Sequence, residues 1–254
     1  MRKIAESEYK NYTEFARAAC SRAYPMSIAE GFQAGDIFES DGGDAALFWH
    51  YCGLAHLSGK APEGFLEEIY ALLISEEKAR RLVLITDDGD AIRYFRDKGA
   101  AIGARAEYVY DPQSAFVEPP DCERFRIEEI NEDNISKIEG RIVPSFSWDS
   151  AARFLSCGFG YVAFDGDLVC AVAFSSAVSS EETDIGVETS EGYRRRNLAS
   201  FLAKKTCERI VGMGKKPVWA HDESNIASAR TAQRCGFVLK KTNAVIRKPA
   251  GIYN

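Results

Sequence analysis

The chain has 254 residues, of which 46% are hydrophobic and 28% are charged, and its formal net charge is -6. This length allows one large hydrophobic core or two smaller ones, because domains cluster at about 100–150 residues. The negative charge argues against nucleic-acid binding, which needs a basic face, and no apolar run approaches the ~20 residues of a membrane helix. The charged residues 1–8 lead into no apolar segment of the signal-peptide kind. We therefore expect a cytoplasmic protein with no nucleic-acid partner and no membrane partner.

The N-terminal half alternates helical and strand-like patterns. Helices are predicted near residues 6–19, 63–76 and 90–98, and strands near residues 45–50, 82–86 and 104–110. No phosphate-binding loop occurs in this half, so we expect it to support the structure or to shape a substrate site.

A domain boundary is predicted where the patterning lapses at residues 116–121. Pro119 and Pro120 are adjacent there, and two consecutive prolines continue neither a helix nor a central strand. The expected division is an N-terminal α/β lobe at residues 1–118 and a second domain at residues 119–254.

The second domain reads as an antiparallel meander followed by a βαβα unit. Strands are predicted at residues 124–130, 160–164, 168–174, 183–189, 217–221 and 238–247, and helices at residues 131–138, 149–155, 195–211 and 225–235. The step Asp165-Gly166 between the second and third strands is a strong hairpin signal. The pattern predicts an α/β (α+β) fold with a mixed, mostly antiparallel sheet flanked by helices.

One spacing occurs in both halves of the chain. The run from Asp88 to Gly99 and the run from Asn225 to Gly236 share one spacing. Each begins with a helix-capping residue, has a small residue three positions later and a small or aromatic residue seven positions later, and ends with glycine at the eleventh. Each run also follows an apolar strand. Two interpretations stay open. Either the halves are a partly decayed tandem repeat, or both runs show the residue pattern that is common to helices with an N-terminal cap and a C-terminal glycine.

The most informative segment of the sequence is Asp184–Ala199. A strand leads to a turn containing Arg194, Arg195 and Arg196, and an apolar-patterned helix follows. The free N–H groups and dipole of a helix N-terminus suit a pyrophosphate, and the arginines add full positive charges. The alternative is a solvated basic turn with no ligand.

At these residues the sequence resembles the GCN5-related N-acetyltransferase (GNAT) superfamily. The first family signature, Arg/Gln-x-x-Gly-x-Gly/Ala, is similar to Arg194, Leu198 and Ala199, with Asn197 in place of the first glycine. Asn tolerates a left-handed backbone better than other non-glycine residues, so we expect the turn to be retained. The second signature is similar to the residues Asn225, Ser228, Ala232, Gly236 and Phe237.

The resemblance covers residues 124–247 and makes the second domain similar to a GNAT fold, with the first lobe as a candidate degenerate GNAT-like repeat. Within the superfamily the chain looks closest to the group of the zwittermicin A resistance acetyltransferase. The resemblance implies acetyl-CoA (CoA) as cofactor and a small-molecule amine as substrate, with a resistance or detoxification role. The implied cofactor-binding residues are Val187, Thr189, Arg194, Arg195, Arg196, Asn197, Leu198, Ala199, Asn225 and Ser228.

Acyl transfer to an amine needs a base, and Glu188 is the predicted one, with Asp184 second. Both carboxylates lie on one face of the predicted strand, and for each the alternative is an ordinary solvated or paired carboxylate. Ala232 stands where many GNAT proteins have a tyrosine that acts as general acid. His221, at the end of the fifth predicted strand of this domain, is the predicted substitute, with a structural histidine as the alternative. The residues Pro144, Phe146 and Trp148 form either an apolar acceptor wall or an ordinary packing cluster.

Other functions remain open from the sequence alone. Asn197 and Ala232 favour a non-catalytic CoA-binding or sensor module, a longer acyl donor needs a wider groove, and a purely structural role would leave the arginine turn without a ligand. The seven cysteines and three histidines show no metal-ligand spacing, so we expect no metal site and reduced thiols. A monomer or a homodimer is expected.

Overall fold

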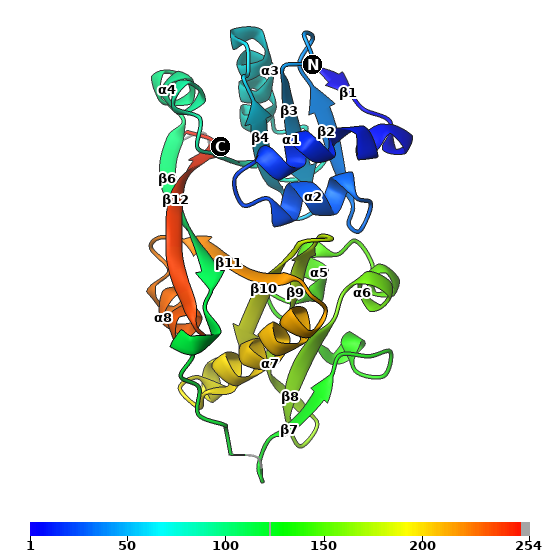
Figure 1. Cartoon of the computed structure of the whole chain (residues 1–254), viewed down its shortest axis with the longest axis vertical. Coiled ribbons are helices and arrows are strands. Elements are labelled where there is room, and N and C mark those ends of the chain that lie inside the picture. The colour runs from blue at the N-terminus through cyan, green and yellow to red at the C-terminus, as the bar shows by residue number, and fades with distance from the viewer. Residues whose placement is uncertain (122, 250–254) are drawn as a thin grey trace. The chain divides into compact units, whose positions relative to one another are not determined.

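The computed structural model describes residues 1–121 and 123–249 of the chain, and Figure 1 shows their helices and strands. Among these residues, no helix combines the length and the apolar character that crossing a membrane requires. The described residues also contain no group of three histidine, cysteine, aspartate or glutamate side chains that could hold a metal ion.

The helices and strands follow one another in mixed order. The α-helices are α1 (Thr13–Ala18), α2 (Ala23–Ala29), α3 (Glu63–Ile74), α4 (Gly89–Asp97), α5 (Pro144–Ser147), α6 (Ala151–Cys157), α7 (Leu198–Gly212) and α8 (Ile226–Arg234). The 3-10 helices are η1 (Glu6–Tyr12), η2 (Pro112–Ser114), η3 (Ile135–Lys137) and η4 (Glu191–Tyr193). The strands are β1 (Arg2–Lys3), β2 (Gly35–Glu39), β3 (Ala45–His50), β4 (Leu54–Gly59), β5 (Val83–Thr86), β6 (Ala101–Tyr110), β7 (Arg126–Glu129), β8 (Gly160–Asp165), β9 (Leu168–Val178), β10 (Glu182–Thr189), β11 (Lys216–Asp222) and β12 (Phe237–Arg247).

The chain divides into two compact units. The first comprises Met1–Ala106 with Lys241–Asn254, as far as the latter is described, and the second comprises Glu107–Lys240. Both borders fall inside a strand, because β6 and β12 each contribute residues to both units. The domain division after residue 118 stays a prediction, since compactness does not show which segment folds alone.

The strands follow a palindromic order in the sheet, β1-β2-β3-β4-β5-β12-β6-β11-β10-β9-β8-β7. Strand n of the first half and strand n+6 of the second half therefore occupy mirrored places. The pairings agree as well: β3–β4 and β9–β10 are antiparallel, whereas β4–β5 and β10–β11 are parallel. The predicted α+β fold class with its mixed, mostly antiparallel sheet is confirmed, and the strand order favours duplication over a chance likeness of two helices.

The two helices that share a spacing also share their caps. The Asp88 side chain accepts hydrogen bonds from the N–H groups of Asp90 and Ala91, and the Asn225 side chain accepts one from Ser228. Gly99 and Gly236 end the two helices with φ angles of 82° and 91°, values that glycine adopts without strain. Capping explains this part of the shared spacing, because both ends of each helix need the same residue types.

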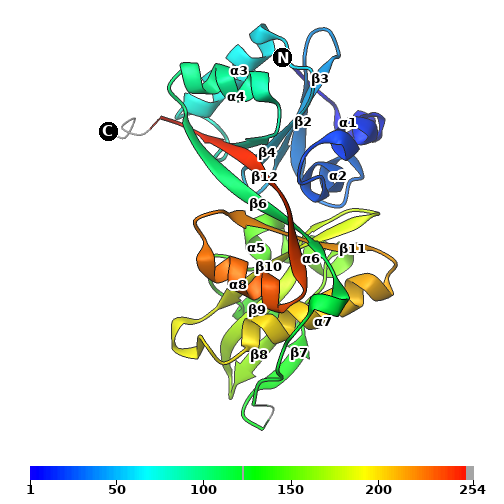
Figure 2. The same cartoon turned by 60° about the vertical axis from the view of Figure 1, so that its left-hand side comes forward.

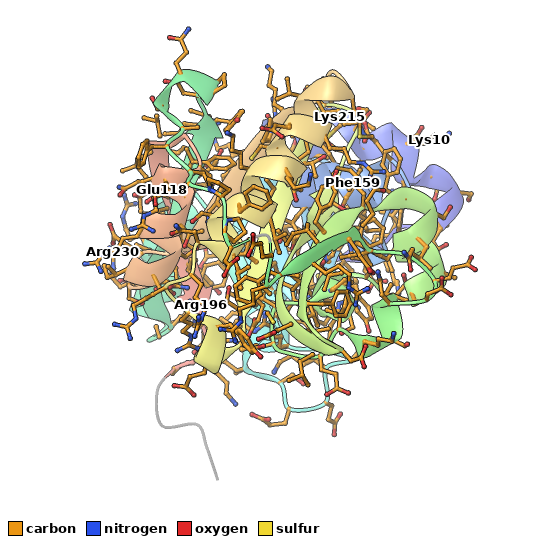
Figure 3. All side chains as sticks on the ribbon, turned by 90° about the horizontal axis from the view of Figure 1, so that it is seen from below. Lys10, Glu118, Phe159, Arg196, Lys215 and Arg230 are labelled. Atoms are coloured by element: carbon orange, nitrogen blue, oxygen red, sulfur yellow. The ribbon has the colours of Figure 1, made fainter. Side chains whose placement is uncertain are left out.

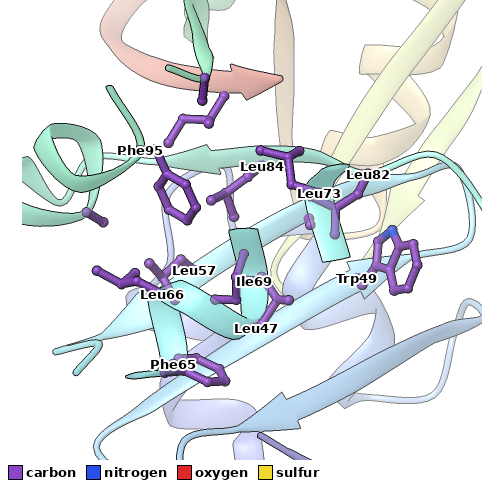
Figure 4. Packing of buried hydrophobic residues seen from close by; sticks show 14 of the residues in the cluster. Leu47, Trp49, Leu57, Phe65, Leu66, Ile69, Leu73, Leu82, Leu84 and Phe95 are labelled. Atoms are coloured by element: carbon purple, nitrogen blue, oxygen red, sulfur yellow. The ribbon is translucent and has the colours of Figure 1, made fainter. Parts of the chain in front are cut away.

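The core of the first unit lies between its strands and α3. Leu47, Leu57 and Leu84 from the strands pack against Ile69 of α3 and Phe95 of α4, all at most 3% exposed (Figure 4). A second cluster, which includes Phe48, Ile37 and Met26, joins the sheet to α2. This two-sided burial explains why β3 is a continuous apolar run with no polar alternation.

In the second unit, α7 packs against β8, β9 and β10 (Figure 2). The predicted hairpin is present, because β8 and β9 pair antiparallel and Gly166 between them has φ 61°. The ring of Phe174 on β9 contacts Phe154 of α6 at a centroid distance of 6.3 Å, which identifies the sheet face that α6 covers.

Three sequence predictions of helices are corrected. Residues 131–138 form only η3, because the Asn131 and Asn134 side chains accept hydrogen bonds from nearby backbone N–H groups and so compete with a helix. Residues 6–19 form η1 followed by α1, and the predicted helix at 195–211 begins at Leu198. The sequence patterns also missed α2, β2 and β4.

Candidate functional site

Two parallel strands part in the middle of the second unit. In the described residues β10 pairs with β11 only at Glu182, Thr183 and Asp184, although β10 continues to Thr189 and β11 to Asp222. The register of β10 on β9 shifts between Asp184 and Ile185, so the parting coincides with a β-bulge. Beyond Asp184, one edge of β10 therefore has no strand partner, which is the geometry that an added extended segment can use.

Side chains of β10 alternate between the two faces as the sequence predicts. A Cβ on Gly186 would meet the Phe174 ring at 2.6 Å, so Gly186 faces the side that α6 covers. Glu188 lies on the same side, because it is two residues further along the strand, and its Oε2 accepts a hydrogen bond from the Ile142 N–H at 2.6 Å. Asp184 is 4% exposed on this strand, whereas Glu188 is partly exposed. Of the two carboxylates, Glu188 is the one within reach of a solute.

Val187 and Thr189 occupy the part of β10 that lies beyond the parting. Both are partly exposed, and each pairs with β9 on its other side, at Ala173 and Ala171. The hydroxyl oxygen of Thr189 is buried and has no hydrogen-bond partner among the described residues. A buried hydroxyl without a partner is uncommon, and this one lies on the part of β10 beyond the parting.

The arginine turn has a strained and exposed backbone. Arg195 and Asn197 both have φ 62°, in the left-handed region, and Arg194, Arg195 and Arg196 are exposed (Figure 3 labels Arg196). The Arg194 Nη1 lies 3.9 Å from Glu191, a loose and solvent-exposed pair. Left-handed backbone at a non-glycine residue is held at a cost and is concentrated at functional turns.

Asn197 takes the backbone conformation that a glycine would supply, as its position in the first signature predicts. It precedes α7, and its side chain does not cap that helix. Its Oδ1 instead accepts a hydrogen bond from Arg234 Nη1 of α8 at 3.4 Å. The first N–H groups of α7, which include those of Leu198 and Ala199, are thus left without a side-chain cap beside three arginines.

His221 is buried against another aromatic side chain, Tyr108 of β6. The His221 Nδ1 lies 2.8 Å from the Asp222 carbonyl oxygen, and because a carbonyl only accepts, Nδ1 carries the proton. Nε2 then accepts from the Tyr108 hydroxyl at 3.2 Å, and the two rings stack with centroids 5.2 Å apart. Burial, followed by the charge of Glu223, raises the pKa of Tyr108. This geometry favours the alternative of a structural histidine.

Residues of the second signature are engaged in packing and capping. Ser228 accepts a hydrogen bond from Trp219 Nε1 at 3.0 Å, while Asn225 caps α8. Ala232 and Cys235 are fully buried, and burial raises the pKa of Cys235 to about 12. Cys235 is therefore a packing residue. Cys122 lies outside the described residues.

Within residues 142–148, Pro144 and Trp148 are buried, whereas Phe146 is partly exposed. Trp148 is 2% exposed, its Nε1 donates to the Ser175 carbonyl at 2.8 Å, and its ring meets Phe154 edge to face at 5.5 Å. Trp148 therefore follows the second of the two interpretations, a residue that packs in the core. The Ile142 N–H is the part of this segment that contacts the candidate site, through Glu188.

Sequence reasoning did not single out the Ile142 backbone or Tyr108, which the structure places against Glu188 and His221, nor Asp165, whose pKa the charge of Arg196 helps to lower. Ile142 contacts through its backbone, which no residue type signals. Tyr108 meets His221 only because β6 and β11 are neighbours in the sheet, and strand order across two halves is not readable from one sequence. The Asp165-Gly166 step did carry a signal, but it was one for a turn.

In this mixed sheet β10 and β11 part, and α7, which follows β10, has no side-chain cap and is preceded by three arginines. This combination is typical of the N-acetyltransferase class. The chain belongs to the GNAT acetyltransferase family, because the family model described by that name matches residues 23–246. The match includes most of the N-terminal half, so both halves belong to the family architecture.

Individual relatives agree with this placement. The chain is 27% identical over 135 residues to the uncharacterized N-acetyltransferase YdfB of Bacillus subtilis, and the match covers 52% of this chain and 52% of that protein. The matched region thus spans about half of that curated relative. A GCN5-related N-acetyltransferase-like protein from Streptococcus suis has a similar fold, with a TM-score of 0.73, 18% identity and coverage of 96% of this chain and 100% of that chain.

A tandem GNAT protein from the clavulanic acid biosynthesis pathway also has a similar fold. Its TM-score is 0.61 at 13% identity, and the alignment covers 99% of this chain and 98% of that chain. At such identities the likeness concerns the fold alone. It agrees with the duplicated strand order described above.

Proposed function

We propose that the chain transfers an acetyl group from acetyl-CoA to a primary amine of a small molecule, by direct attack of the amine on the thioester. The observation that carries the proposal is the left-handed turn at Asn197, which leaves the N-terminus of α7 uncapped beside Arg194 and Arg196. Such a site suits a pyrophosphate, which needs several N–H donors and positive charge.

The residues present fit the cofactor in two places. Arg194, Arg195, Arg196 and the N–H groups that follow Asn197 would hold its phosphates. The open edge of β10 at Val187 and Thr189 would pair with its extended pantetheine arm, and the buried Thr189 hydroxyl offers an unused hydrogen-bonding group. When bound, acetyl-CoA supplies the acetyl thioester. Asn225 and Ser228, occupied by capping and by Trp219, would support this site without direct contact.

Glu188 is our candidate for the base that removes the proton of the attacking ammonium. Its Oε2 accepts a hydrogen bond from the Ile142 N–H, and the Glu188 side chain is partly exposed. A carboxylate fixed in this way is oriented before the amine arrives, and orientation is a large part of general-base catalysis. Asp184 is the second candidate and is nearly buried. His221 is the weakest of the three, since both of its ring nitrogens already have partners.

Several finer statements stay predictions. They are the identity of the amine, the resistance or detoxification role, the likeness to the zwittermicin A resistance group, the cytoplasmic location, and a monomeric or homodimeric state. The rival function is a non-catalytic CoA-binding or sensor module, which the fully buried Ala232 favours because it offers no proton donor in place of tyrosine.

Calorimetric titration with acetyl-CoA, CoA and ATP tests the proposal without knowledge of the amine. We expect acetyl-CoA to bind in the micromolar range, about -8 kcal/mol. The double variant Arg194→Glu with Arg196→Glu should bind at least about a hundredfold more weakly, because it reverses two charges at the phosphate site. The matched control is Arg93→Glu with Arg96→Glu on α4, which makes the same change in net charge at exposed residues of the first unit.

Wild-type protein that binds neither CoA species would overturn the proposal. Equal affinity of the wild type and the turn variant would remove the arginine turn from the site. Binding without acetyl transfer to any member of an amine library would favour the sensor function.

A further inference from the structure

A second set of contacts lies behind the arginine turn and joins it to the β8–β9 hairpin. The Arg124 side chain donates to Asp165 Oδ2 from Nη2 at 2.6 Å and from Nε at 3.0 Å. The Tyr193 side chain, one residue before the arginines, lies close enough to this carboxylate to contribute to lowering its pKa. The Tyr193 ring also meets Phe125 edge to face at 6.1 Å, and Arg124 lies over the Phe125 ring at 5.2 Å. Arg124 therefore contacts both Asp165 of the hairpin and, through the Phe125 ring, the segment that carries Tyr193.

The backbone makes the same connection. The Ser190 N–H donates to the Cys170 carbonyl at 2.9 Å, and the Ser190 hydroxyl donates to the Val169 carbonyl at 3.2 Å. The start of the turn is thus fixed to the start of β9, two to three residues past the hairpin loop. Any displacement of the hairpin carries the turn with it.

Asp165 is also an acid close to a site that we propose for phosphates. Its pKa is lowered first by the hydrogen bond from Arg124, and further by the charges of Arg124 and Arg196. Arg196 therefore feels the Asp165 charge. The bond from Ser190 to Val169, which pairs with Phe164, brings Asp165 to the start of the turn, so a carboxylate without Arg124 would attract Arg196 and compete with an anionic ligand.

We propose that Arg124 is a positioning residue for the phosphate site: it occupies the Asp165 carboxylate, so that Arg196 stays available to the cofactor and Tyr193 stays fixed to the hairpin. This inference rests on the proposed function of the turn. Arg124 acts through Asp165 and needs no contact with the cofactor.

Neutralising the two partners separately and together tests this role in the full chain. Calorimetry with acetyl-CoA should show that Arg124→Gln binds about threefold to tenfold more weakly than the wild type, because it frees one negative charge beside the site. Asp165→Asn should bind within about twofold of the wild type, and the double variant should recover nearly all of the lost affinity. Arg153→Gln, which removes an exposed arginine paired with Asp149, is the control for a lost positive charge.

Salt dependence separates this electrostatic role from a structural one. The difference between Arg124→Gln and the wild type should shrink toward zero at ~1 M salt, where charges are screened beyond about 3 Å. Wild-type affinity in Arg124→Gln, or a double variant as weak as Arg124→Gln, would overturn the inference while leaving the proposed function standing. Absence of acetyl-CoA binding in the wild type would overturn both.

Discussion

Single residues decide the backbone of the candidate site. Asn197 replaces a family glycine, and its φ of 62° shows that the replacement preserves the left-handed turn. Arg195 has the same φ without the side-chain chemistry that makes Asn tolerant, so the turn holds strain that the contacts of Tyr193 and Ser190 must balance. Arg195 is exposed on this turn, where the proposed phosphate site needs positive charge.

Glu188→Gln separates proton removal from positioning. Gln retains an oxygen that can accept from the Ile142 N–H, so the loop before α5 should remain in place and acetyl-CoA affinity should not change. Acetyl transfer should fall about a hundredfold near pH 7, because general bases contribute roughly this much. The loss should diminish as the pH approaches the pKa of the amine, since the neutral amine attacks without help. A pH profile of the rate is the measurement, and an equal loss at every pH would argue for a structural role of Glu188.

Two buried histidines of the first unit predict acid sensitivity. Burial lowers the pKa of His50 to about 3, and it lowers the pKa of His56 well below its ordinary value, with smaller effects from Arg105. The unfolded chain takes up protons on both rings below about pH 6.5, whereas the folded chain does not. Stability should therefore be unaffected by these groups at higher pH and should fall below pH 6.5, by up to about 1.4 kcal/mol per pH unit for each histidine.

Urea denaturation at pH 8, 6.5 and 5 measures this slope. His56→Phe keeps an aromatic ring beside Tyr24, whose centroid lies 5.8 Å from the His56 ring, and removes one titrating group. We expect it to remove about half of the histidine contribution to the loss between pH 6.5 and 5. An unchanged slope in the variant would mean that His56 becomes protonated in the folded state.

At the scale of elements, the sequence was most informative where local chemistry decides the structure. The hairpin at Gly166 and the caps at Asp88 and Asn225 were readable because a turn or a helix end accepts few residue types. The helix predicted at residues 131–138 failed for the same physical reason, since two asparagines bonded to nearby backbone instead. The helix α2 was missed because its residues are all buried and show no periodic polar face.

The candidate site could be predicted from the sequence only where the side chain of a residue determines its role. The arginine turn and the Asn197 substitution were predicted from the sequence, and the structure places them at the start of α7. Contacts that depend on pairing between distant strands, such as Tyr108 with His221, were not predicted. The contact of Ile142 with Glu188 could not be predicted either, because it is made by the Ile142 backbone N–H, a group that nearly all residue types have.

At the scale of the whole chain, the palindromic strand order makes the two halves dependent on each other's strands. β12, the last strand of the second half, pairs with β5 of the first half through Ala244, Val245 and Ile246. β6, the last strand of the first half, is the neighbour of β11 in the sheet order. A duplicated unit that exchanges its final strand cannot be separated by cutting at a single point.

This arrangement predicts the outcome of cutting at the proline pair. A fragment of residues 119–254 lacks Tyr108, whose ring stacks on His221, and Tyr110, whose ring centroid lies 5.3 Å from that of Phe237. It also loses the hydrogen bond from the Asp111 N–H to the Gly236 carbonyl. A fragment of residues 107–254 keeps all three contacts. Losing the buried Tyr108 and the partly buried Tyr110 removes about 3–5 kcal/mol, so the shorter fragment should unfold about 10 °C lower.

Thermal unfolding followed by circular dichroism compares the two fragments, with the full chain as reference. Equal midpoints would support a domain that begins at residue 119, as the proline pair predicts, and would make β6 an accessory of the second unit. A lower midpoint or aggregation of the shorter fragment would place the start of the folding unit inside β6. Acetyl-CoA titration of whichever fragment folds then shows whether the arginine turn needs the first half, because β10, α7 and α8 are present in both.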